Sequence, residues 1–262
     1  MDKREAQLVA AMLEAYRSGV FPMADPDTHE IEWYSPDPRA LMPLWFEPDE
    51  NDRCFHVSRS LASRIRSRRF TITTDVAFES VIRSCGEPRP ERPDSWIDER
   101  IVHAYTSLFR AGHAHSVEAW LPVGEAQLPA PEKNCVTPVL SPDRASVLVG
   151  GVYGVSIGAA FFAESMFCRP ELGVVRTSDG HNVKLPGTDA SKIALFHLVS
   201  HLKSRGYTIM DVQFDNPHID RFGVFSISRA KYLRLLRDAC KRTIGWLPFD
   251  SGAVSPASLG NA

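Results

Sequence analysis

The sequence lacks the features that mark several large classes of protein. It contains no stretch of about 18 apolar residues, so we expect no helix that crosses a membrane. Its first residues, Met-Asp-Lys-Arg-Glu, lack the apolar core of a secretory signal peptide. The formal net charge of -2 excludes a broadly basic coat for nucleic acid but permits a local basic patch. These absences argue against a membrane-spanning protein and a broadly basic nucleic-acid coat.

Disulfide and metal-binding patterns are also scarce. The chain has five cysteines, an odd number, and they are widely spaced without a CxxC pair. Reduced thiols are the simplest interpretation, because a disulfide framework needs cysteines in pairs. His113 and His115 lie two residues apart, but no set of His and Cys has zinc spacing, so a structural pair is favoured over a metal site. The sequence also has no GxxxxGK phosphate loop.

The periodicity of the chain predicts an α+β fold with a mixed sheet and packed helices. Helices are expected over 5–18, 58–69, 98–111, 189–205 and 228–241, with Asp189 as a capping residue. Strands are expected over 115–120, 147–155, 157–165 and 207–213, and the glycines inside 147–155 indicate close backbone approach or a bulge. Irregular loops over 122–145 and 169–188 and a disordered tail over 249–262 complete this prediction.

The most informative stretch is the apolar run that begins at Tyr207 and ends in the polar loop Asp215-Asn-Pro-His218. Side chains alternate along a strand, so Asp211 and Gln213 are predicted to be neighbours on one face. A carboxylate beside a carboxamide suits a site that holds an amine and a carbonyl together. The alternative is a strand end that faces solvent.

Several sequence blocks, in order along the chain, resemble one enzyme family. They are Ala15-Tyr-Arg-Ser-Gly-Val-Phe-Pro22, Trp33-Tyr-Ser-Pro-Asp-Pro-Arg-Ala40, Ser95-Trp-Ile-Asp98 with Ala104-Tyr105, Gly112-His-Ala-His-Ser-Val-Glu118, Leu148-Val-Gly-Gly-Val-Tyr-Gly-Val155, Glu164-Ser-Met-Phe167, Ala190-Ser-Lys192, Asp211-Val-Gln213 and His218. Together they resemble leucyl/phenylalanyl-tRNA–protein transferase. Met23 departs from the family pattern, in which an aromatic residue normally follows Phe-Pro.

The resemblance implies a specific reaction. Such enzymes move Leu or Phe from the 3′ end of a charged tRNA to the N-terminal amine of a protein that begins with Lys or Arg, which creates a degradation signal. It also implies a catalytic domain, here 63–248, with a fold like the acyl-CoA N-acyltransferases, and a small N-terminal domain, here 1–62. No metal or dissociable cofactor is implied, and we expect a monomer.

Three polar residues are the candidates for catalysis. Aminolysis of an activated ester gains roughly 10²–10⁴-fold from a general base. Correct placement of the reactants contributes about 7–11 kcal/mol, so positioning is expected to be the larger effect. Asp211 is predicted to orient Gln213 and polarise the amine, and Gln213 to hold the amine or the ester carbonyl. Glu164, at the end of an apolar strand, is predicted to receive the amine or to fix a pocket wall.

The remaining candidates would bind substrate. Val152, Phe161, Met166 and Phe167 are candidates for an aminoacyl pocket, with plain core packing as the alternative. The resemblance places Tyr16, Trp96 and Tyr105 near the tRNA 3′ end, with Met23, Asn216 and His218 as further substrate contacts. Trp96 is the preferred stacking residue, since base–aromatic stacking contributes roughly 1–3 kcal/mol per base. Tyr16 and Tyr105 also lie on helix stripes typical of core residues.

Basic residues offer candidates for tRNA phosphates. Arg64, Arg66, Arg68 and Arg69 follow Arg59 in a short basic helix, for which a solvated charged face is the alternative. Lys192 lies near a positive helix start, where a phosphate would explain a cation.

Three other functions stay open at this stage. One is a transferase with altered aminoacyl specificity, Met included, or altered acceptor specificity. Another is a small-molecule N-acyltransferase that uses acyl-CoA, although the helix start at Asp189-Ala-Ser-Lys192 lacks a Gly/Arg-rich pyrophosphate loop. The third is a non-catalytic module that binds tRNA or peptide, which Met23 favours.

Overall fold

The computed structural model describes residues 2–25, 28, 30–88, 94–122, 139–170, 174–176, 182–184 and 187–249. Most of the predicted loop over 122–145 and nearly all of the predicted tail over 249–262 lie outside the described residues.

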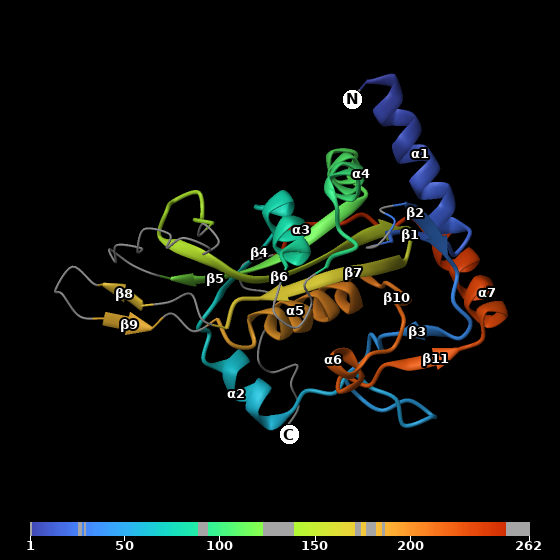
Figure 1. The fold of residues 1–262 in the computed structure, drawn as a ribbon. Coiled ribbons are helices and arrows are strands. Elements are labelled where there is room, and N and C mark those ends of the chain that lie inside the picture. The colour runs from blue at the N-terminus through green and yellow to red at the C-terminus, as the bar shows by residue number, and fades with distance from the viewer. Residues whose placement is uncertain are drawn as a thin grey trace.

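A seven-stranded sheet forms the centre of the protein, with the strand order β11-β3-β10-β7-β6-β5-β4 (Figure 1). Its strands are β3 (Arg39–Leu41), β4 (Thr71–Thr74), β5 (Ala114–Pro122), β6 (Ser146–Ile157), β7 (Ala160–Cys168), β10 (Ile209–Gln213) and β11 (Phe225–Ile227). Strands β10 and β7 pair in parallel, and the other neighbouring pairs are antiparallel. The predicted mixed sheet is therefore confirmed.

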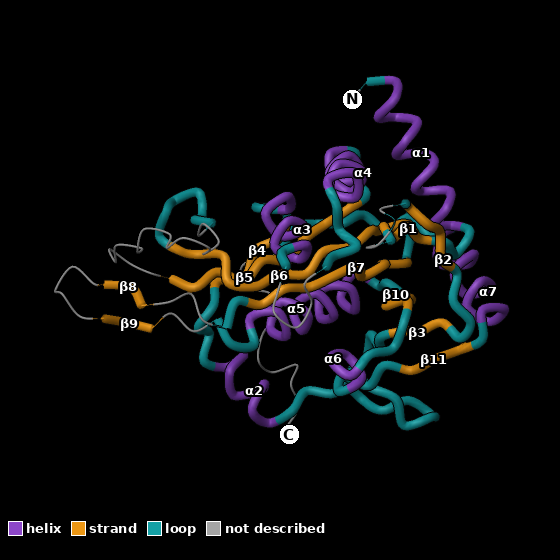
Figure 2. Tube along the Cα trace, viewed as in Figure 1, coloured by secondary structure: helices purple, strands orange, loops and turns teal. Residues whose placement is uncertain are grey.

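Helices cover both faces of this sheet (Figure 2). Helix α5 (Ala190–Arg205) packs on one face together with α2 (Arg59–Arg66). The other face carries α3 (Phe78–Gly86), α4 (Glu99–Arg110), α1 (Lys3–Arg17) and α7 (Arg229–Cys240). Two buried apolar clusters result: the first contains Tyr16 and Phe162, and the second contains Val152 and Phe161. We call them the α1/α4 layer and the α5 layer.

The parallel pair of strands is the place where the sheet opens. Helix α5 connects β7 to β10, as expected for a crossover between adjacent parallel strands. Their pairing covers only Ile209–Asp211 against Ala160–Phe162. Residues beyond Asp211 and Phe162 do not pair with each other, so both strands present side chains to the space between their ends.

Local sequence signals fix most of the helix starts. The side chains of Ser58, Asp98 and Ser228 accept hydrogen bonds from backbone N–H groups in the first turns of α2, α4 and α7. The prediction that Asp189 caps α5 is wrong, because its side chain makes no capping bond and its φ is 66°. Helix α2 ends at Arg66, short of the predicted 69.

Strands from the N-terminal quarter of the chain were missed by the sequence prediction. Strand β3 lies between β10 and β11 in the central sheet, and β1 (Phe21–Ala24) pairs with β2 (Ile31–Tyr34) in a separate two-stranded sheet. The predicted loop over 169–188 contains a second small sheet, formed by β8 (Val174–Arg176) and β9 (Asn182–Lys184). Short strands of three or four residues carry too little alternation to be recognised.

Candidate active site

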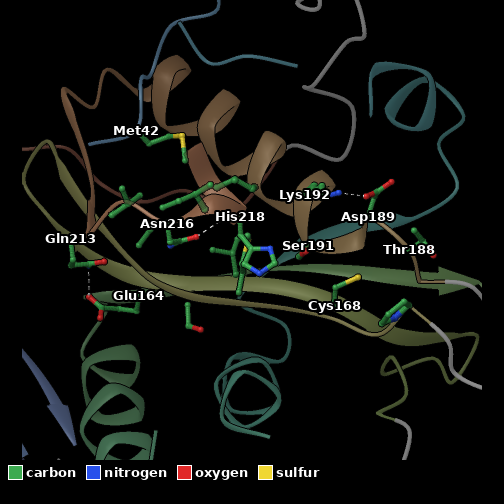
Figure 3. Close-up of a pocket in the computed structure, with 18 residues that line it drawn as sticks. Met42, Glu164, Cys168, Thr188, Asp189, Ser191, Lys192, Gln213, Asn216 and His218 are labelled. Atoms are coloured by element: carbon green, nitrogen blue, oxygen red, sulfur yellow. Dashed lines mark hydrogen bonds and ion pairs between the residues drawn. The ribbon is translucent and has the colours of Figure 1, made fainter. Parts of the chain in front are cut away.

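A cavity of about 550 Å³ lies where β7 and β10 separate (Figure 3). It is bounded by these strands, by β6, by the first turn of α5 and by the short helix α6 (Pro217–Asp220). Seven predicted site residues line it: Val152, Glu164, Met166, Lys192, Gln213, Asn216 and His218. Its size suits a small ligand or one end of a larger one.

A β-bulge in β7 determines which side chains reach the cavity. Tyr153 pairs with Ser165 and Gly154 pairs with Ala163, so Glu164 is the extra residue. A Cβ atom at Gly154 would lie 2.2 Å from the carbonyl oxygen of Phe162, which confirms the predicted close backbone approach in β6.

The same bulge reverses the alternation of faces along β7. Phe161 lies in the α5 layer before the bulge, whereas Met166 lies in that layer after it and Phe167 lies in the α1/α4 layer. Met166 lines the cavity, but Phe161 and Phe167 are 1% exposed and do not. The prediction of both phenylalanines as pocket residues is therefore corrected to core packing.

Glu164 is held by two buried tyrosines. The hydroxyl of Tyr16 donates to Glu164 Oε1 at 2.7 Å, and the hydroxyl of Tyr105 donates to Oε2 at 3.0 Å. The two hydroxyl oxygens lie 2.5 Å apart. Burial raises the pKa of Glu164 to about 7, while the tyrosine hydrogen bonds act in the opposite direction. A carboxylic acid with this pKa exchanges protons near neutral pH.

Tyr16 and Tyr105 are both 0% exposed, so neither presents a free ring face to a base. Their predicted place at the tRNA end is corrected: they support Glu164 from the α1/α4 layer. The helix stripes on which they lie had indicated this alternative.

Asp211 is enclosed within the protein. It is 0% exposed and is held by Arg39, whose Nε lies 2.9 Å from Oδ1 and whose Nη2 lies 2.7 Å from Oδ2. The hydroxyl of Tyr232 donates to Oδ2 at 2.5 Å, and the backbone N–H of Gln213 donates to Oδ1 at 2.9 Å. A carboxylate so surrounded fixes its neighbours and leaves no oxygen directed to a ligand in the cavity.

Gln213 turns into the cavity because the chain bends there. A second bulge separates Asp211 from Gln213, and the φ of Gln213 is 62°. Val212 and Gln213, adjacent in sequence, consequently both line the cavity. The predicted regular alternation is interrupted at this point. The side chain of Gln213 lies over Glu164, with Nε2 3.5 Å from Oε1 (Figure 3).

The cavity differs in character along its length. Its apolar lining includes Val152 and Met166, joined by Met42, Leu195 and Val212, which the sequence prediction missed. Those three residues carry no signal apart from hydrophobicity, which every core residue shares.

At its other end the cavity meets the first turn of α5. Lys192 Nζ lies 2.6 Å from Asp189 Oδ1, and Arg64 forms an ion pair with the other oxygen of Asp189. The carboxylate of Asp189 therefore balances the charge of Lys192 near this helix start, so no phosphate is needed to explain that cation. The same carboxylate also pairs with Arg64.

Other predicted residues lie outside the cavity lining. Met23 and Trp96 are partly buried and pack against the α1/α4 layer. Arg66, Arg68 and Arg69 are exposed. Asn216 and His218, by contrast, line the cavity and are exposed at its rim, and Asn216 caps α6 by accepting a hydrogen bond from the N–H of His218 at 3.0 Å.

The structure shows two further properties of the described residues. Nδ1 of His115 lies 2.9 Å from Oδ2 of Asp75, and within the described part of the chain no group of three or more His, Cys, Asp or Glu is arranged to hold a metal ion. No helix within that part is long and apolar enough to span a bilayer. The cavity itself joins a carboxyl group of nearly neutral pKa, a carboxamide and an apolar surface.

Comparison with known proteins identifies the family to which these features are related. The family profile for leucyl/phenylalanyl-tRNA protein transferase matches residues 51–127 and 182–237. The profile for the N-terminal domain of leucyl/phenylalanyl-tRNA protein transferase matches residues 8–37.

Individual proteins with the same name are similar over most of their length. The leucyl/phenylalanyl-tRNA–protein transferase of Paramagnetospirillum magneticum is 40% identical over 244 residues, which cover 93% of this chain and 92% of the relative. The one from Gloeobacter violaceus is 41% identical over 228 residues, covering 87% of this chain and 91% of the relative. The one from Hyphomonas neptunium is 38% identical over 247 residues, which cover 94% of this chain and 76% of the relative.

Proposed function

The chain belongs to the leucyl/phenylalanyl-tRNA protein transferase family, and from this premise we propose that it transfers Leu or Phe from tRNA to the N-terminal amine of proteins that begin with Lys or Arg. At the coarser level it is an aminoacyltransferase that acts between an aminoacyl-tRNA and a protein. The observation that carries the proposal is the apolar cavity with Glu164 and Gln213 side by side at one end.

The apolar lining receives the side chain of the transferred amino acid. Val152 and Met166 come from the sheet, and Leu195 comes from α5. Burial of an apolar side chain of this size contributes roughly 1.5–3 kcal/mol. Aliphatic and aromatic side chains suit this apolar lining, which supports Leu or Phe and also allows Met. A charged aminoacyl group would be left without a partner at the apolar end.

Gln213 is the residue that contacts the reacting groups. Its carboxamide both donates and accepts, so it holds the attacking amine or the ester carbonyl. Asp211 orients Gln213 through the backbone N–H, and Glu164 receives the amine from the other side. In the reaction a C–N bond forms at the carbonyl carbon, the ester C–O bond breaks, and the ribose oxygen leaves with a proton. Because the ester is already activated, placement of the two reactants is the main contribution.

The proposed contacts with tRNA phosphates lie on the side of α2 and the start of α5. Arg66, Arg68 and Arg69 meet backbone phosphates, and Lys192 lies at the end of the cavity that faces them. Arg64 is also proposed to contribute to tRNA binding, and its ion pair with Asp189 holds it beside the start of α5. Trp96 and Met23, which pack against the α1/α4 layer, remain contacts of the terminal nucleoside that the family resemblance implies, and Asn216 and His218 are the proposed contacts at the cavity rim.

The wider setting follows from the family. We infer that the product is a degradation signal, that the protein acts as a monomer in the cytoplasm, and that it needs no cofactor. The sheet with one parallel pair supports the proposed likeness to acyl-CoA N-acyltransferases over 63–248. Residues 1–62 are proposed as a small N-terminal domain that lends β3 to this sheet.

The test is transfer of labelled Leu, Phe, Met, Arg and Glu from their tRNAs to peptides that begin with Lys, Arg, Asp, Glu or Ala. Leu or Phe on Lys- and Arg-peptides alone is the expected result. Another pairing would indicate altered specificity. No transfer with tRNA still bound would favour a non-catalytic module, and binding of CoA in a titration would favour the small-molecule alternative.

One variant assigns the chemistry of Gln213 within this test. Gln213→Ala is expected to reduce transfer while tRNA binding is nearly unchanged. Equal loss of both would place Gln213 in the scaffold.

A further inference from the structure

Three side chains, Tyr16, Tyr105 and Glu164, form a closed triangle of contacts beside the cavity. The hydroxyl of Tyr16 lies 2.7 Å from Glu164, the hydroxyl of Tyr105 lies 3.0 Å from Glu164, and the two hydroxyls lie 2.5 Å from each other. All three contacts have the length of O–H···O hydrogen bonds. Tyr16 and Tyr105 are 0% exposed, so bulk water does not reach them to supply a further donor.

Counting hydrogens shows what this triangle lacks. Each phenol carries one hydrogen, so ionised Glu164 leaves two hydrogens for three contacts. One of the three oxygen pairs is then unsatisfied, most directly the pair between the two hydroxyls. Protonated Glu164 supplies the third hydrogen and the ring closes, with each oxygen group donating once and accepting once. The site is therefore built to accommodate a proton on Glu164.

The charged groups around Glu164 agree with this. Asp211 faces it from β10 and raises its pKa, while Arg39 on β3 lowers it. Arg39 makes its bidentate pair with Asp211 and not with Glu164. Of the two neighbouring carboxyl groups, only that of Asp211 is in direct contact with a cation, Arg39. Because this contact keeps Asp211 ionised and Glu164 has no such contact, Glu164 is the carboxyl group suited to exchange a proton.

The remaining titratable groups lie elsewhere in the cavity. Lys192 is paired with Asp189 at the far end. His218 lies on the rim, in α6. Gln213, which is uncharged, is the group that joins Glu164 to the reacting atoms.

We propose that Glu164 accepts the proton released by the acceptor's α-ammonium group and that the Tyr16–Tyr105 pair holds this proton in a closed hydrogen-bonded ring. This inference rests on the proposed function and assigns one step within it. Asp211 is a positioning residue in this scheme, and Glu164 is the catalytic base.

The α-ammonium nitrogen loses two protons in this reaction. The first goes to Glu164 Oε1 or Oε2, and the freed electron pair forms the C–N bond at the ester carbonyl carbon. The second leaves the nitrogen of the tetrahedral intermediate and passes to the ribose oxygen as the carbonyl re-forms and the C–O bond breaks. Glu164 then releases its proton to water in the cavity, so the enzyme ends with the same carboxylate with which it began.

The first experiment compares the parent chain with Glu164→Gln from pH 6 to pH 9, at saturating charged tRNA and saturating Lys-peptide. We expect about a 10²-fold lower rate at pH 7, the low end of general-base effects. An amine of pKa about 8 is only about one-tenth neutral at pH 7, so the deficit should shrink by roughly tenfold at pH 9. A deficit that is the same at every pH would overturn the proposal.

The second experiment distinguishes the effect of the hydrogen-bonded ring of Tyr16, Tyr105 and Glu164 from the effect of general packing. Tyr105→Phe opens the ring that holds the proton on Glu164, so the midpoint of the pH–rate profile should fall by roughly 0.5–1 pH unit. A rise would mean that Tyr105 acts only as a donor to ionised Glu164, and it would overturn the ring. Tyr207→Phe is the matched control, since it also removes one buried hydroxyl, bonded to Ser156 at 2.7 Å, away from the cavity. Equal profiles for the two variants would refute the ring.

Failure of the inference is distinguishable from failure of the proposed function. If the parent chain transfers no amino acid, the proposed function is wrong, and the inference about Glu164 that rests on it falls with it. If the parent chain transfers Leu or Phe and Glu164→Gln shows a uniform deficit, the function stands and the proton assignment falls. Thermal unfolding of each variant at pH 7 confirms that the folded enzyme is being measured.

Discussion

Replacing Arg39 by methionine tests whether a buried ion pair supports the site from behind. Arg39 is 1% exposed and Asp211 is 0% exposed, so water cannot replace the lost contact. The change removes three N–H···O contacts of 2.7–3.1 Å to Asp211 and one of 3.2 Å to the carbonyl oxygen of Gly19. It leaves a buried carboxylate that still accepts hydrogen bonds from Tyr232 and from the N–H of Gln213.

The expected magnitude follows from the burial of both partners. Removing one partner of a buried ion pair destabilises a protein by about 3–5 kcal/mol, because the other charge stays uncompensated. In a chain of this size each kcal/mol lowers Tm by roughly 2–4 °C, so Arg39→Met should lose roughly 6–20 °C. Transfer should fall further than folding alone explains, because Asp211 loses the guanidinium that fixes its position and so holds the N–H of Gln213 less firmly.

The assay is urea unfolding, with Arg83→Met as the control. Arg83 forms ion pairs with Glu79 and Glu99, but these side chains are 45%, 53% and 79% exposed. Exposed pairs contribute about 0–1 kcal/mol, so the control should change stability little. Adding Asp211→Asn to Arg39→Met should recover part of the loss, because the buried charge is gone. An Arg39→Met loss no larger than that of Arg83→Met would refute the reasoning.

Two further predictions concern pH and salt. Burial raises the folded pKa of Glu164 from 4.5 to about 7, so the folded state binds this proton more tightly and the parent chain loses stability as pH rises between these values. Glu164→Gln should therefore gain up to about 3 kcal/mol relative to the parent between pH 4.5 and pH 7, and a pH-independent difference in urea unfolding would contradict this. Replacing Arg66, Arg68 or Arg69 by alanine should make the slope of log K for tRNA against log salt less steep by about 0.7–0.9 for each arginine; unchanged slopes would remove them from the interface.

Much of the architecture was accessible from the sequence. The 3.6-residue stripe of α5 and the Gly206 that ends it, with φ of 79°, identify the helix without tertiary information. Ser58, Asp98 and Ser228 do the same for three helix starts, because a capping side chain acts within three residues of itself. The order of these elements then gave the mixed α+β class.

The site was accessible in part. Glu164, Asp211 and Gln213 were named from residue type and strand position, and the structure brings them together at the ends of β7 and β10. Arg39 and Tyr232 were not named as partners of Asp211, since they lie far from it in the chain and an arginine in a Pro-rich stretch reads as exposed.

The tertiary structure alone decided which side chains face the cavity. The bulge at Glu164 exchanges the faces of β7, so Met166 reaches the cavity whereas Phe167 enters the opposite core. The bend at Gln213 likewise directs two adjacent residues into one space. A bulge arises from the pairing of two strands and leaves no periodic trace in either one. The sequence by itself therefore determined the elements and the reactive groups, and strand pairing determined how those groups meet.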